Sequence, residues 1–389
     1  MQTKKFYQKK IKKDLYLQDQ IYLIKDYIMS QNEVEVIIIL GPHRSGTSLF
    51  AKFVSCYGYE FTENLIPKNK YNQKGYFEDK DIIDFNEKLL KSVNFTWNKN
   101  QFIDNKLQNS KIITDVNLDL AKKLIRNKLF QNNKIILKDP RFSILINFWK
   151  KVFSEIQVRT KYICLLRNPI EVSLSMLRRD TTSITYGLCL WSIYILEIIK
   201  NCNYNNFLFI SLNTFQNNPE KTKEILNKYL SKKLEKDEFE KYLSDFYSKD
   251  LFSTRLNENI LENEILINKE FRNIYQSLLS LVDDYNEDNL FKVKQKLDEV
   301  RNNLDLNKNF ELLDWEYEKI LSDNKTNDGK YNEKIKQFEI EKSKSLRIIQ
   351  NADKSIKEES RILTTQQKRI ERDHEELKNK LTEFEDYKS

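Results

Sequence analysis

Glycine, proline, cysteine and histidine are scarce in this sequence. The 389 residues include only 6 Gly, 5 Pro, 4 Cys and 2 His. The cysteines have no Cys-x-x-Cys spacing and lie mostly among apolar residues, which predicts buried thiols in a reducing compartment and argues against disulfides or a zinc site. Because His43 and His374 are the only histidines, a histidine-based metal centre is not expected either.

Long apolar runs are also missing. The longest one, Leu188–Ile199, is interrupted by Ser192, Tyr194 and Glu197, so we predict no membrane-spanning helix. Residues 1–13 are polar and basic and lack the apolar centre of a signal peptide, which predicts a cytoplasmic protein. The net charge of +8 is spread over intermixed Lys, Arg, Asp and Glu. This charge fits a protein that binds an anion, such as a nucleotide or an acidic glycan, and predicts no nucleic-acid partner.

Two of the few glycines bound a single loop. Val36–Leu40 is a short, β-branched, apolar run that is typical of a buried parallel strand. A loop between Gly41 and Gly46 follows this run, and Ser48 opens a helical pattern. In such a strand-loop-helix unit, the backbone N–H groups and the positive end of the helix dipole favour a bound phosphate.

The loop differs from a nucleoside-triphosphate loop at one position. Thr47 stands where a Walker A sequence has Lys, and the cation is Arg44, two residues before Gly46. This arrangement resembles the phosphosulfate loop of sulfotransferases that use 3′-phosphoadenosine 5′-phosphosulfate (PAPS). The resemblance implies that the 5′-phosphosulfate of PAPS is bound by a run of loop residues, namely Arg44, Ser45, Gly46, Thr47 and Ser48.

A second motif follows another strand-like run, Tyr162–Leu166. Arg167 comes directly after this run, Pro169 suits the first turn of a helix, and Ser175 lies inside that helix. In sulfotransferases, an Arg and a Ser at this spacing hold the 3′-phosphate of PAPS. A guanidinium can donate two hydrogen bonds to a phosphate and a hydroxyl can donate a further one. The resemblance therefore assigns Arg167 and Ser175 to the 3′-phosphate.

A third strand-like run, Lys134–Lys138, leads into a Lys-Asp-Pro-Arg segment, Lys138–Arg141. Together with Gly75–Glu78 and the two motifs above, this segment resembles bacterial sulfotransferases of the carbohydrate and tyrosyl-protein type over residues 33–262. The resemblance implies that Lys138 stabilises the bridging oxygen that leaves during transfer. It also implies that no metal is needed, because fixed cations and N–H groups neutralise the donor.

The resemblance also implies a carboxylate as the base that removes the acceptor proton. Neither histidine lies in the acceptor-facing stretch after the first helix, and glycan and tyrosyl-protein sulfotransferases use a Glu. Glu78 is our first choice, and its alternative role is to cap the next helix. The same stretch offers three further carboxylates: Glu60, Glu63 and Asp79. The expected catalytic set is thus Glu78, Lys138 and Arg44, while His43 either packs within the loop or donates to the sulfuryl group.

The order of segments predicts an α/β fold, with a P-loop-like parallel sheet and helices on both faces. Strands are expected at Val34–Leu40, Lys134–Lys138, Lys161–Leu166 and Phe207–Ser211. Helices are expected at Ser48–Tyr57, Asp81–Lys91, Asn117–Asn127, Ile144–Phe153, Pro169–Arg178 and Leu188–Lys200. Ligands of such sheets bind beyond the carboxyl ends of the strands, so the three motifs are expected to share one crevice.

The segments that flank residues 33–262 have a different composition. Residues 1–32 predict a basic helical lead-in, and residues 263–330 predict a helical extension. Within residues 331–389, a seven-residue apolar repeat predicts a coiled coil and hence a homodimer. The repeat consists of Ile349, Ile356, Leu363, Ile370, Leu377 and Phe384. Because the second core position of each heptad is mostly polar, a lone solvated helix or a disordered tail is the alternative.

The leading hypothesis is a PAPS-dependent sulfotransferase that transfers a sulfuryl group to a hydroxyl or amine of a carbohydrate or glycan. One alternative is a P-loop nucleotide or small-molecule kinase, which the missing Lys before Ser48 disfavours. The other is a degenerate sulfotransferase fold that acts as a docking module, which the presence of Arg44, Arg167 and Ser175 disfavours.

Overall fold

The structure, a computed structural model, describes residues 33–68, 74–103, 106–180, 182, 184–247 and 269–303. The predicted lead-in (1–32) and the predicted coiled-coil tail (331–389) lie outside the described residues.

The core of the described chain is a five-stranded parallel sheet with the strand order β2-β3-β1-β4-β5. The strands are β1 (Glu35–Leu40), β2 (Glu60–Phe61), β3 (Lys134–Lys138), β4 (Arg159–Leu166) and β5 (Phe207–Ser211). Four of these lie where strands are predicted, and the α/β fold class is confirmed. The two-residue edge strand β2 is too short to leave a pattern in the sequence.

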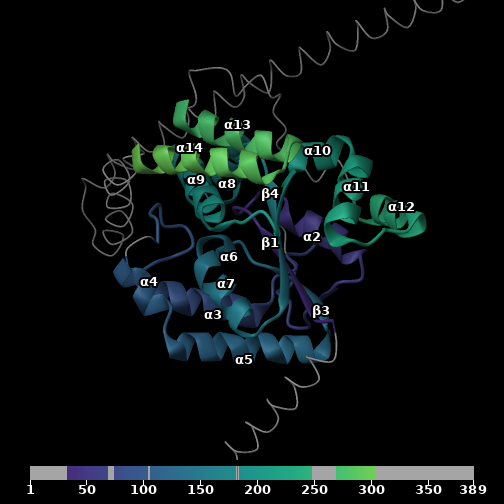
Figure 1. The fold of residues 1–389 in the computed structure, drawn as a ribbon, viewed down its shortest axis with the longest axis horizontal. Helices are drawn as coiled ribbons and strands as arrows, with labels where there is room; N and C mark the ends of the chain where they lie inside the picture. The colour runs from purple at the N-terminus through teal and green to yellow at the C-terminus, as the bar shows by residue number, and fades with distance from the viewer. Residues whose placement is uncertain are drawn as a thin grey trace, which may run out of the picture. The chain divides into compact units, whose positions relative to one another are not determined.

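The helices of the described chain cover both faces of this sheet. They are α2 (Thr47–Ser55), α3 (Lys80–Lys91), α4 (Lys106–Ile112), α5 (Asp115–Gln131), α6 (Arg141–Ile144), α7 (Ile146–Glu155), α8 (Pro169–Asp180), α9 (Ile184–Asn201), α10 (Leu212–Asn217), α11 (Pro219–Leu230), α12 (Lys236–Asp245), α13 (Lys269–Asp283) and α14 (Glu287–Asn303). Figure 1 shows α2 and α10 to α12 on one side of the strands and α3 and α5 to α7 on the other.

One predicted helix, Ile144–Phe153, is wrong in its bounds. The structure has a short helix, α6, and a second one, α7, with Leu145 between them at φ −102° and ψ 15°. The first begins early because an Asp139 oxygen accepts the backbone N–H of Arg141 at 3.0 Å and starts the turn. The Asp-Pro pair of the third motif is therefore the start of a helix and not a loop.

Alternating residues of the strands pack on opposite faces of the sheet. Ile37 and Ile39 of β1 join a buried cluster with α2, α10, α11 and α12. Val36, Ile38 and Leu40 are equally buried and face the other side. A strand that is buried on both faces needs an unbroken apolar sequence, which explains why the run Val36–Leu40 is so easily recognised.

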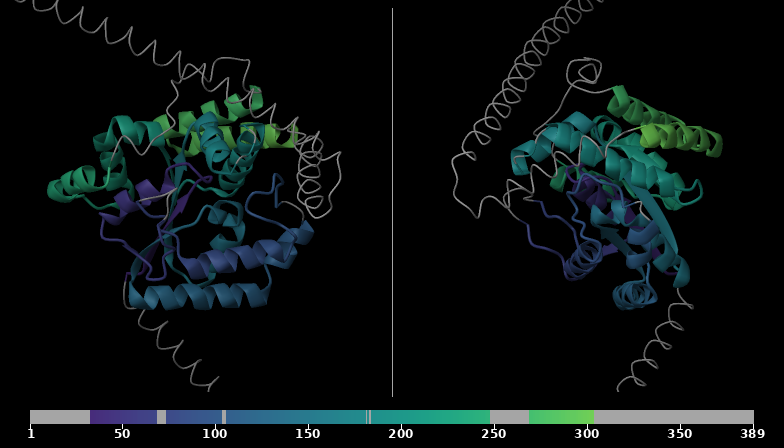
Figure 2. Two further views of the ribbon diagram at one scale, coloured as in Figure 1. Left: turned by 180° about the vertical axis from the view of Figure 1, so that it is seen from behind. Right: turned by 90° about the vertical axis from the view of Figure 1, so that its left-hand side faces the viewer.

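The helical pair α13–α14 packs on this α/β core. Figures 1 and 2 show the two helices side by side, and α13 contacts β5 and α9 while α14 contacts α9. Arg301 on α14 pairs with Glu197 on α9 at 2.7 Å, with both side chains buried. These helices lie within the stretch 263–330 for which the sequence predicts a helical extension.

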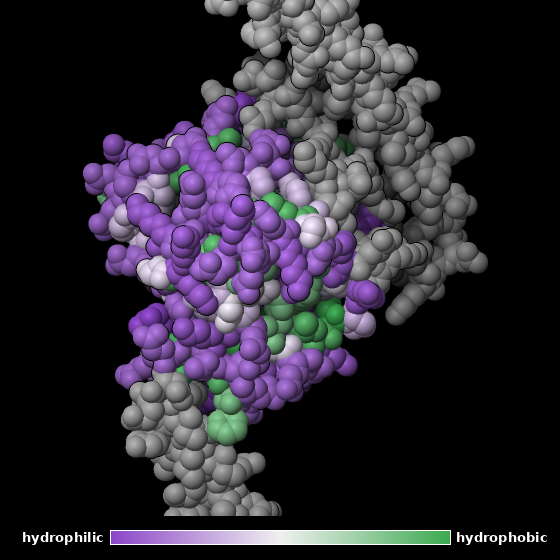
Figure 3. Space-filling view, turned by 90° about the vertical axis from the view of Figure 1, so that its right-hand side faces the viewer, coloured by the Kyte–Doolittle hydropathy of each residue, from purple (hydrophilic) through white to green (hydrophobic). Residues whose placement is uncertain are grey.

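The polar surface and the free cysteines are as the composition of the sequence leads one to expect. The face in Figure 3 is mostly polar, with a small apolar patch. All four cysteines are free thiols, of which Cys164, Cys189 and Cys202 are buried and Cys56 is half-buried. No helix in the described part of the chain is long and apolar enough to cross a membrane.

Candidate active site

The three sequence motifs lie together because their strands are neighbours. In the strand order β3-β1-β4, the chain leaves β1 into the Gly41–Gly46 loop, leaves β3 at Lys138, and leaves β4 at Arg167. All three strands are parallel, so their carboxyl ends meet at one edge of the sheet. The three motifs therefore lie at the same edge of the sheet.

The loop after β1 has a backbone that only certain residues tolerate. Gly41 and Gly46 have φ of 143° and 82°, and Arg44 has φ 68°. A Cβ on Gly41 would lie 3.0 Å from the carbonyl oxygen of Leu165 in β4. The loop also binds Ser143 of α6, because the Gly41 N–H donates to Ser143 Oγ at 3.1 Å. Glycine is thus required by both conformation and space at the start of this loop.

Helix α2 starts directly after the loop and has no side-chain cap. Gly46 occupies the N-cap position, and the helix begins at Thr47. The first N–H groups of a helix have no partner within the helix, so they can bind an anion. The Ser45 N–H is instead used inside the loop, where it donates to the Pro42 carbonyl at 3.3 Å. Ser48 Oγ donates to the carbonyl oxygen of Tyr76 at 3.2 Å, which ties α2 to the Gly75–Glu78 segment.

Arg44 lies next to both predicted 3′-phosphate residues. Its Nε donates to Ser175 Oγ at 2.9 Å, and Arg167 Nη1 donates to the Arg44 carbonyl oxygen at 2.8 Å. Burial lowers the pKa of the Arg44 guanidinium, and the nearby guanidiniums of Arg179 and Arg167 lower it further. The loop thus contacts Arg167, which follows β4, and Ser175, which lies in α8, although both are more than one hundred positions away in the sequence.

Arg44 differs from the neighbouring cations in its partners. Within the described residues, no carboxylate is in ion-pair contact with Arg44. Four neighbouring cations do have such a partner: Lys138 with Glu78, Arg141 with Asp139, Arg167 with Glu171 and Arg179 with Asp180. Asp180 offsets part of the repulsion that Arg44 receives from Arg179 and Arg167, but it makes no direct contact with Arg44. A part-buried guanidinium that faces other guanidiniums and touches no carboxylate is suited to an anionic ligand.

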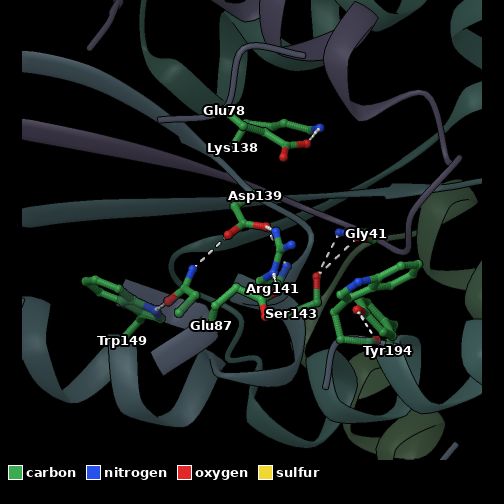
Figure 4. A network of polar contacts seen from close by, with 11 residues as sticks. Gly41, Glu78, Glu87, Lys138, Asp139, Arg141, Ser143, Trp149 and Tyr194 are labelled. Carbon is green, nitrogen blue, oxygen red and sulfur yellow. Dashed lines mark hydrogen bonds and ion pairs between the residues drawn. The ribbon is translucent and has the colours of Figure 1, made fainter. Parts of the chain in front are cut away.

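Glu78 and Lys138 form a buried ion pair. Lys138 Nζ lies 2.5 Å from Glu78 Oε1, and both residues are buried. Burial raises the pKa of Glu78, while the nearby Lys138 ammonium acts against that rise. Figure 4 shows the two side chains side by side at the end of β3.

The capping role considered for Glu78 belongs to its neighbour. Asp79 is the N-cap of α3, because its Oδ1 accepts the N–H groups of Asp81 and Ile82 at 2.8 and 3.2 Å. Asp79 also pairs with Lys128. Of the other carboxylates in the stretch, Glu60 and Glu63 are exposed. Glu78 is therefore the carboxylate of the stretch that the structure places beside Lys138.

Asp139 and Arg141 form an ion pair within a larger network (Figure 4). Asp139 Oδ1 accepts from Arg141 Nη1 at 2.9 Å, and its Oδ2 accepts from Asn86 Nδ2 at 2.9 Å. Arg141 Nε donates to Glu87 Oε1 at 2.6 Å. Both oxygens of Asp139 are thus taken up by protein groups, and the network fixes the chain just after Lys138. Asn86 and Glu87 were not found from the sequence, because nothing in the α3 pattern distinguishes them.

His43 packs against aromatic rings at the edge of the loop. Its ring centroid lies 4.3 Å from that of Trp97 and 5.9 Å from that of Tyr194. Tyr194 Oη donates to the Trp97 carbonyl at 2.7 Å, and the Arg179 guanidinium lies 5.6 Å from the Trp97 ring centroid. The predicted packing of His43 in the loop is thus observed. No sequence pattern pointed to Trp97, Tyr194 and Arg179 as a group.

One nitrogen of the His43 ring nevertheless lacks a hydrogen-bond partner. Its Nε2 atom is enclosed and has no hydrogen-bond partner within the described residues. Burial holds the pKa of His43 well below its ordinary value, and four cations lower it further: Arg141, Arg179, Lys138 and Arg44. The imidazole is therefore neutral at neutral pH.

Two of the tryptophans are too deeply buried to stack on the base of a bound nucleotide. Trp149 and Trp191 are completely buried in the core, whereas Trp97 is half-buried. Within the described residues, no group of three or more His, Cys, Asp or Glu side chains lies together as metal ligands would.

The sequence matches no known family model, and no curated protein matches it. Three solved structures illustrate what the chain is similar to. The sulfotransferase domain of the Synechococcus PCC 7002 olefin synthase is 16% identical with a TM-score of 0.36, covering 68% of this chain and 94% of that one. The sulfotransferase domain from the curacin biosynthetic pathway is 14% identical with a TM-score of 0.35. The match covers 68% of this chain and 98% of that one.

The third is a sulfotransferase from Alicyclobacillus acidocaldarius, which is 12% identical with a TM-score of 0.35 and covers 64% of this chain and 93% of that one. Each of these three proteins is a sulfotransferase or a sulfotransferase domain.

Proposed function

We propose that this protein transfers a sulfuryl group from PAPS to an acceptor hydroxyl or amine. The observation that carries the proposal is Arg44, a part-buried guanidinium that has no carboxylate partner among the described residues and lies beside Arg167 and Arg179. A donor with two anionic groups supplies the missing counter-charges. It would replace the neutral Ser175 hydroxyl as the main partner of Arg44.

Each end of the donor has its own group of residues. Arg44, Ser45, Gly46, Thr47 and Ser48 hold the 5′-phosphosulfate, with the open start of α2 supplying N–H groups. Arg167 and Ser175 hold the 3′-phosphate through charge-assisted hydrogen bonds. No metal takes part in this scheme, because the cations of the site neutralise the donor.

The Glu78–Lys138 pair supplies the proton acceptor and the cation that the reaction needs. The acceptor oxygen forms a new bond to sulfur, and its proton passes to the Glu78 carboxylate. The bond between sulfur and the bridging oxygen breaks, and that oxygen keeps the electron pair on the 5′-phosphate of the product. When Glu78 takes up the proton, Lys138 is released from its ion pair and can stabilise the leaving oxygen. Burial favours this sequence, because it raises the pKa of Glu78.

The acceptor in this proposal is a carbohydrate or glycan, as the resemblance to bacterial carbohydrate-type sulfotransferases implies. The net charge of +8 agrees with an acidic glycan, because opposite charge speeds the encounter. We also propose that the protein is a cytoplasmic homodimer paired through residues 331–389.

The donor is tested by thermal unfolding with the product nucleotide 3′-phosphoadenosine 5′-phosphate (PAP). PAP should raise the melting temperature, because a ligand that binds only the folded state stabilises that state. The rise should persist in EDTA, and ATP with Mg²⁺ should have a smaller effect. Stabilisation by ATP that depends on Mg²⁺, with none by PAP, would instead identify a kinase.

The base is tested by Glu78→Gln with labelled PAPS and a panel of glycans. Turnover should fall about a hundredfold or more, the usual range for a general base, while PAP affinity stays near that of the native protein. Glu60→Gln is the matched control, since it removes an exposed carboxylate of the same stretch. Full activity of Glu78→Gln would rule out Glu78, and Glu63 would be examined next.

A further inference from the structure

We propose that His43 is a further catalytic residue, whose Nε2–H donates a hydrogen bond to an oxygen of the sulfuryl group under transfer. This inference rests on the proposed function and names the contact by which the loop recognises the group that is transferred. It makes His43 the residue that distinguishes PAPS from PAP, because PAP differs from PAPS only by the missing sulfuryl group.

The first support is the unsatisfied Nε2 atom. It is enclosed and has no partner among the described residues. A buried polar atom without a hydrogen bond costs about 1–3 kcal/mol, so such atoms are rare in folded proteins unless a ligand completes them. The sulfuryl group offers oxygens that can only accept, which suits an Nε2 atom that carries the hydrogen.

The second support is the way in which the ring is held. Trp97 and Tyr194 pack on the imidazole with centroid distances of 4.3 and 5.9 Å. Tyr194 also fixes Trp97 through its hydrogen bond to the Trp97 carbonyl at 2.7 Å. The ring is therefore held by aromatic contacts that leave its Nε2 atom unused.

The third support is the charge around the ring. The imidazole lies within electrostatic range of Arg44, the proposed phosphosulfate contact, and of Lys138, the proposed contact of the bridging oxygen. Arg141 and Arg179 complete the charged groups around it, and the titratable Tyr194 also faces it. A positive charge on His43 would be repelled by all four cations. The ring therefore donates its hydrogen bond as a neutral group, and it neither takes up nor gives up a proton during transfer.

The two-histidine composition allows a direct test by nuclear magnetic resonance. Protein labelled with ¹⁵N-histidine should give imidazole signals from only His43 and His374, and the variant His374→Gln assigns them. We expect the His43 ring to be neutral with its proton on Nε2. Its Nε2–H signal should move when PAPS is added and move much less when PAP is added.

Affinity measurements on variants give a second readout. His43→Ala should weaken PAPS about tenfold, the loss expected for a hydrogen bond to a charged group, while PAP affinity changes less than about threefold. His43→Gln should recover most of the PAPS affinity, because its amide can reach the Nε2 position, whereas His43→Asn should not. His374→Gln is the matched control and should change neither affinity.

Three outcomes would overturn the inference. If His43→Ala weakens PAPS and PAP equally, His43 only packs the loop. If the His43 signal responds in the same way to both nucleotides, the sulfuryl group does not contact it. If the native protein binds neither nucleotide, the proposed function and this inference fall together, which distinguishes that failure from the other two.

Discussion

At Arg44, two unfavourable effects act on one guanidinium. Burial removes water from the charge, and Arg167 and Arg179 add like charges nearby. A neutral hydroxyl, Ser175 Oγ at 2.9 Å, is the polar contact of its side chain in the described chain. A folded protein tolerates such a position when a ligand supplies the missing negative charge, and in the function proposed above the 5′-phosphosulfate of PAPS is that ligand group.

Replacing the proposed 3′-phosphate contacts should weaken PAP binding. Arg167→Ala removes a guanidinium that can donate two hydrogen bonds to a phosphate, so we expect affinity to fall on the order of tenfold to a hundredfold. Ser175→Ala removes one neutral donor, so the loss should be about tenfold or less. Isothermal titration calorimetry with PAP measures both effects.

Arg159→Ala is the matched control for the loss of charge. Arg159 is exposed and begins β4, whereas Arg167 follows the other end of that strand. If Arg159→Ala weakens PAP as much as Arg167→Ala does, net charge and not a specific contact determines binding.

His43 should make the stability of the fold depend on pH in a defined range. The pKa of His43 in the folded protein lies well below its ordinary value of 6.5. Below pH 6.5 the unfolded chain therefore takes up a proton that the folded chain does not, and stability falls as the pH falls. The loss is at most about 1.4 kcal/mol per pH unit for one group.

Melting temperatures of the native protein and of His43→Gln at pH 7.0, 6.0 and 5.5 would measure this effect. The native protein should lose more stability over this range than His43→Gln, which has no group to protonate there. His374→Gln should follow the native protein. Identical curves for all three proteins would mean that His43 is protonated as easily in the folded state as in the unfolded state.

The sequence predicted the site residues that belong to a local motif. It did not predict the residues that reach the site only through packing of distant segments. Arg44, Arg167 and Ser175 follow strands at fixed spacings, so their convergence could be predicted before the structure. Trp97 and Arg179 lie in segments without any such spacing. Their place beside His43 depends on how α8 and α9 pack against the segment before α4, and no local pattern encodes that packing.

At the scale of elements, buried strands were the easiest to predict and helix ends the hardest. β3 and β5 have the predicted bounds because apolar, β-branched runs have few other uses. The early start of α6 was missed, since it depends on a hydrogen bond that the Asp139 side chain accepts from the Arg141 N–H. The predicted helix 117–127 extends to Asp115–Gln131, with Thr114 as its N-cap.

The contact between α8 and α9 should be sensitive to one added methyl group. A Cβ on Gly187 of α9 would lie 2.8 Å from Ser173 Cα in α8, and that backbone atom cannot rotate away. Alanine favours a helix over glycine by about 1 kcal/mol, but overpacking costs about 1–3 kcal/mol. We expect Gly187→Ala to lower the melting temperature and, by shifting nearby Ser175, to weaken PAP binding.

Differential scanning calorimetry and PAP titration test this prediction. Glu224→Ala on α11 is the control, because it places alanine at an exposed helix position and should change stability by less than about 0.5 kcal/mol. A Gly187→Ala protein as stable as the native one would show that the two helices can separate at little cost.

At the scale of the whole molecule, α9 explains the most apolar stretch of the sequence. Its residues from Leu188 to Leu196 are buried on every side, because α8, α6, α7 and the pair α13–α14 all pack on this helix. A helix that is apolar all round is buried, and here protein covers it. The sequence predicted the helices that follow residue 262, but not that they complete the cover of α9. Amphipathic helices show which face is apolar without showing what that face meets.

The last prediction concerns residues 331–389, which lie outside the described residues. Their apolar stripe, from Ile349 to Phe384, repeats every seven residues and is too narrow to bury against a globular face. Pairing with a second copy of the same stripe removes it from water, while the flanking Lys and Glu keep the pair soluble.

Light scattering should therefore find the full chain as a dimer and the chain without residues 331–389 as a monomer. PAP affinity should be unchanged by the truncation, because every proposed donor contact lies before residue 180. A full-length chain that is already a monomer would refute the pairing, whereas a truncated chain that remains a dimer would place the interface elsewhere.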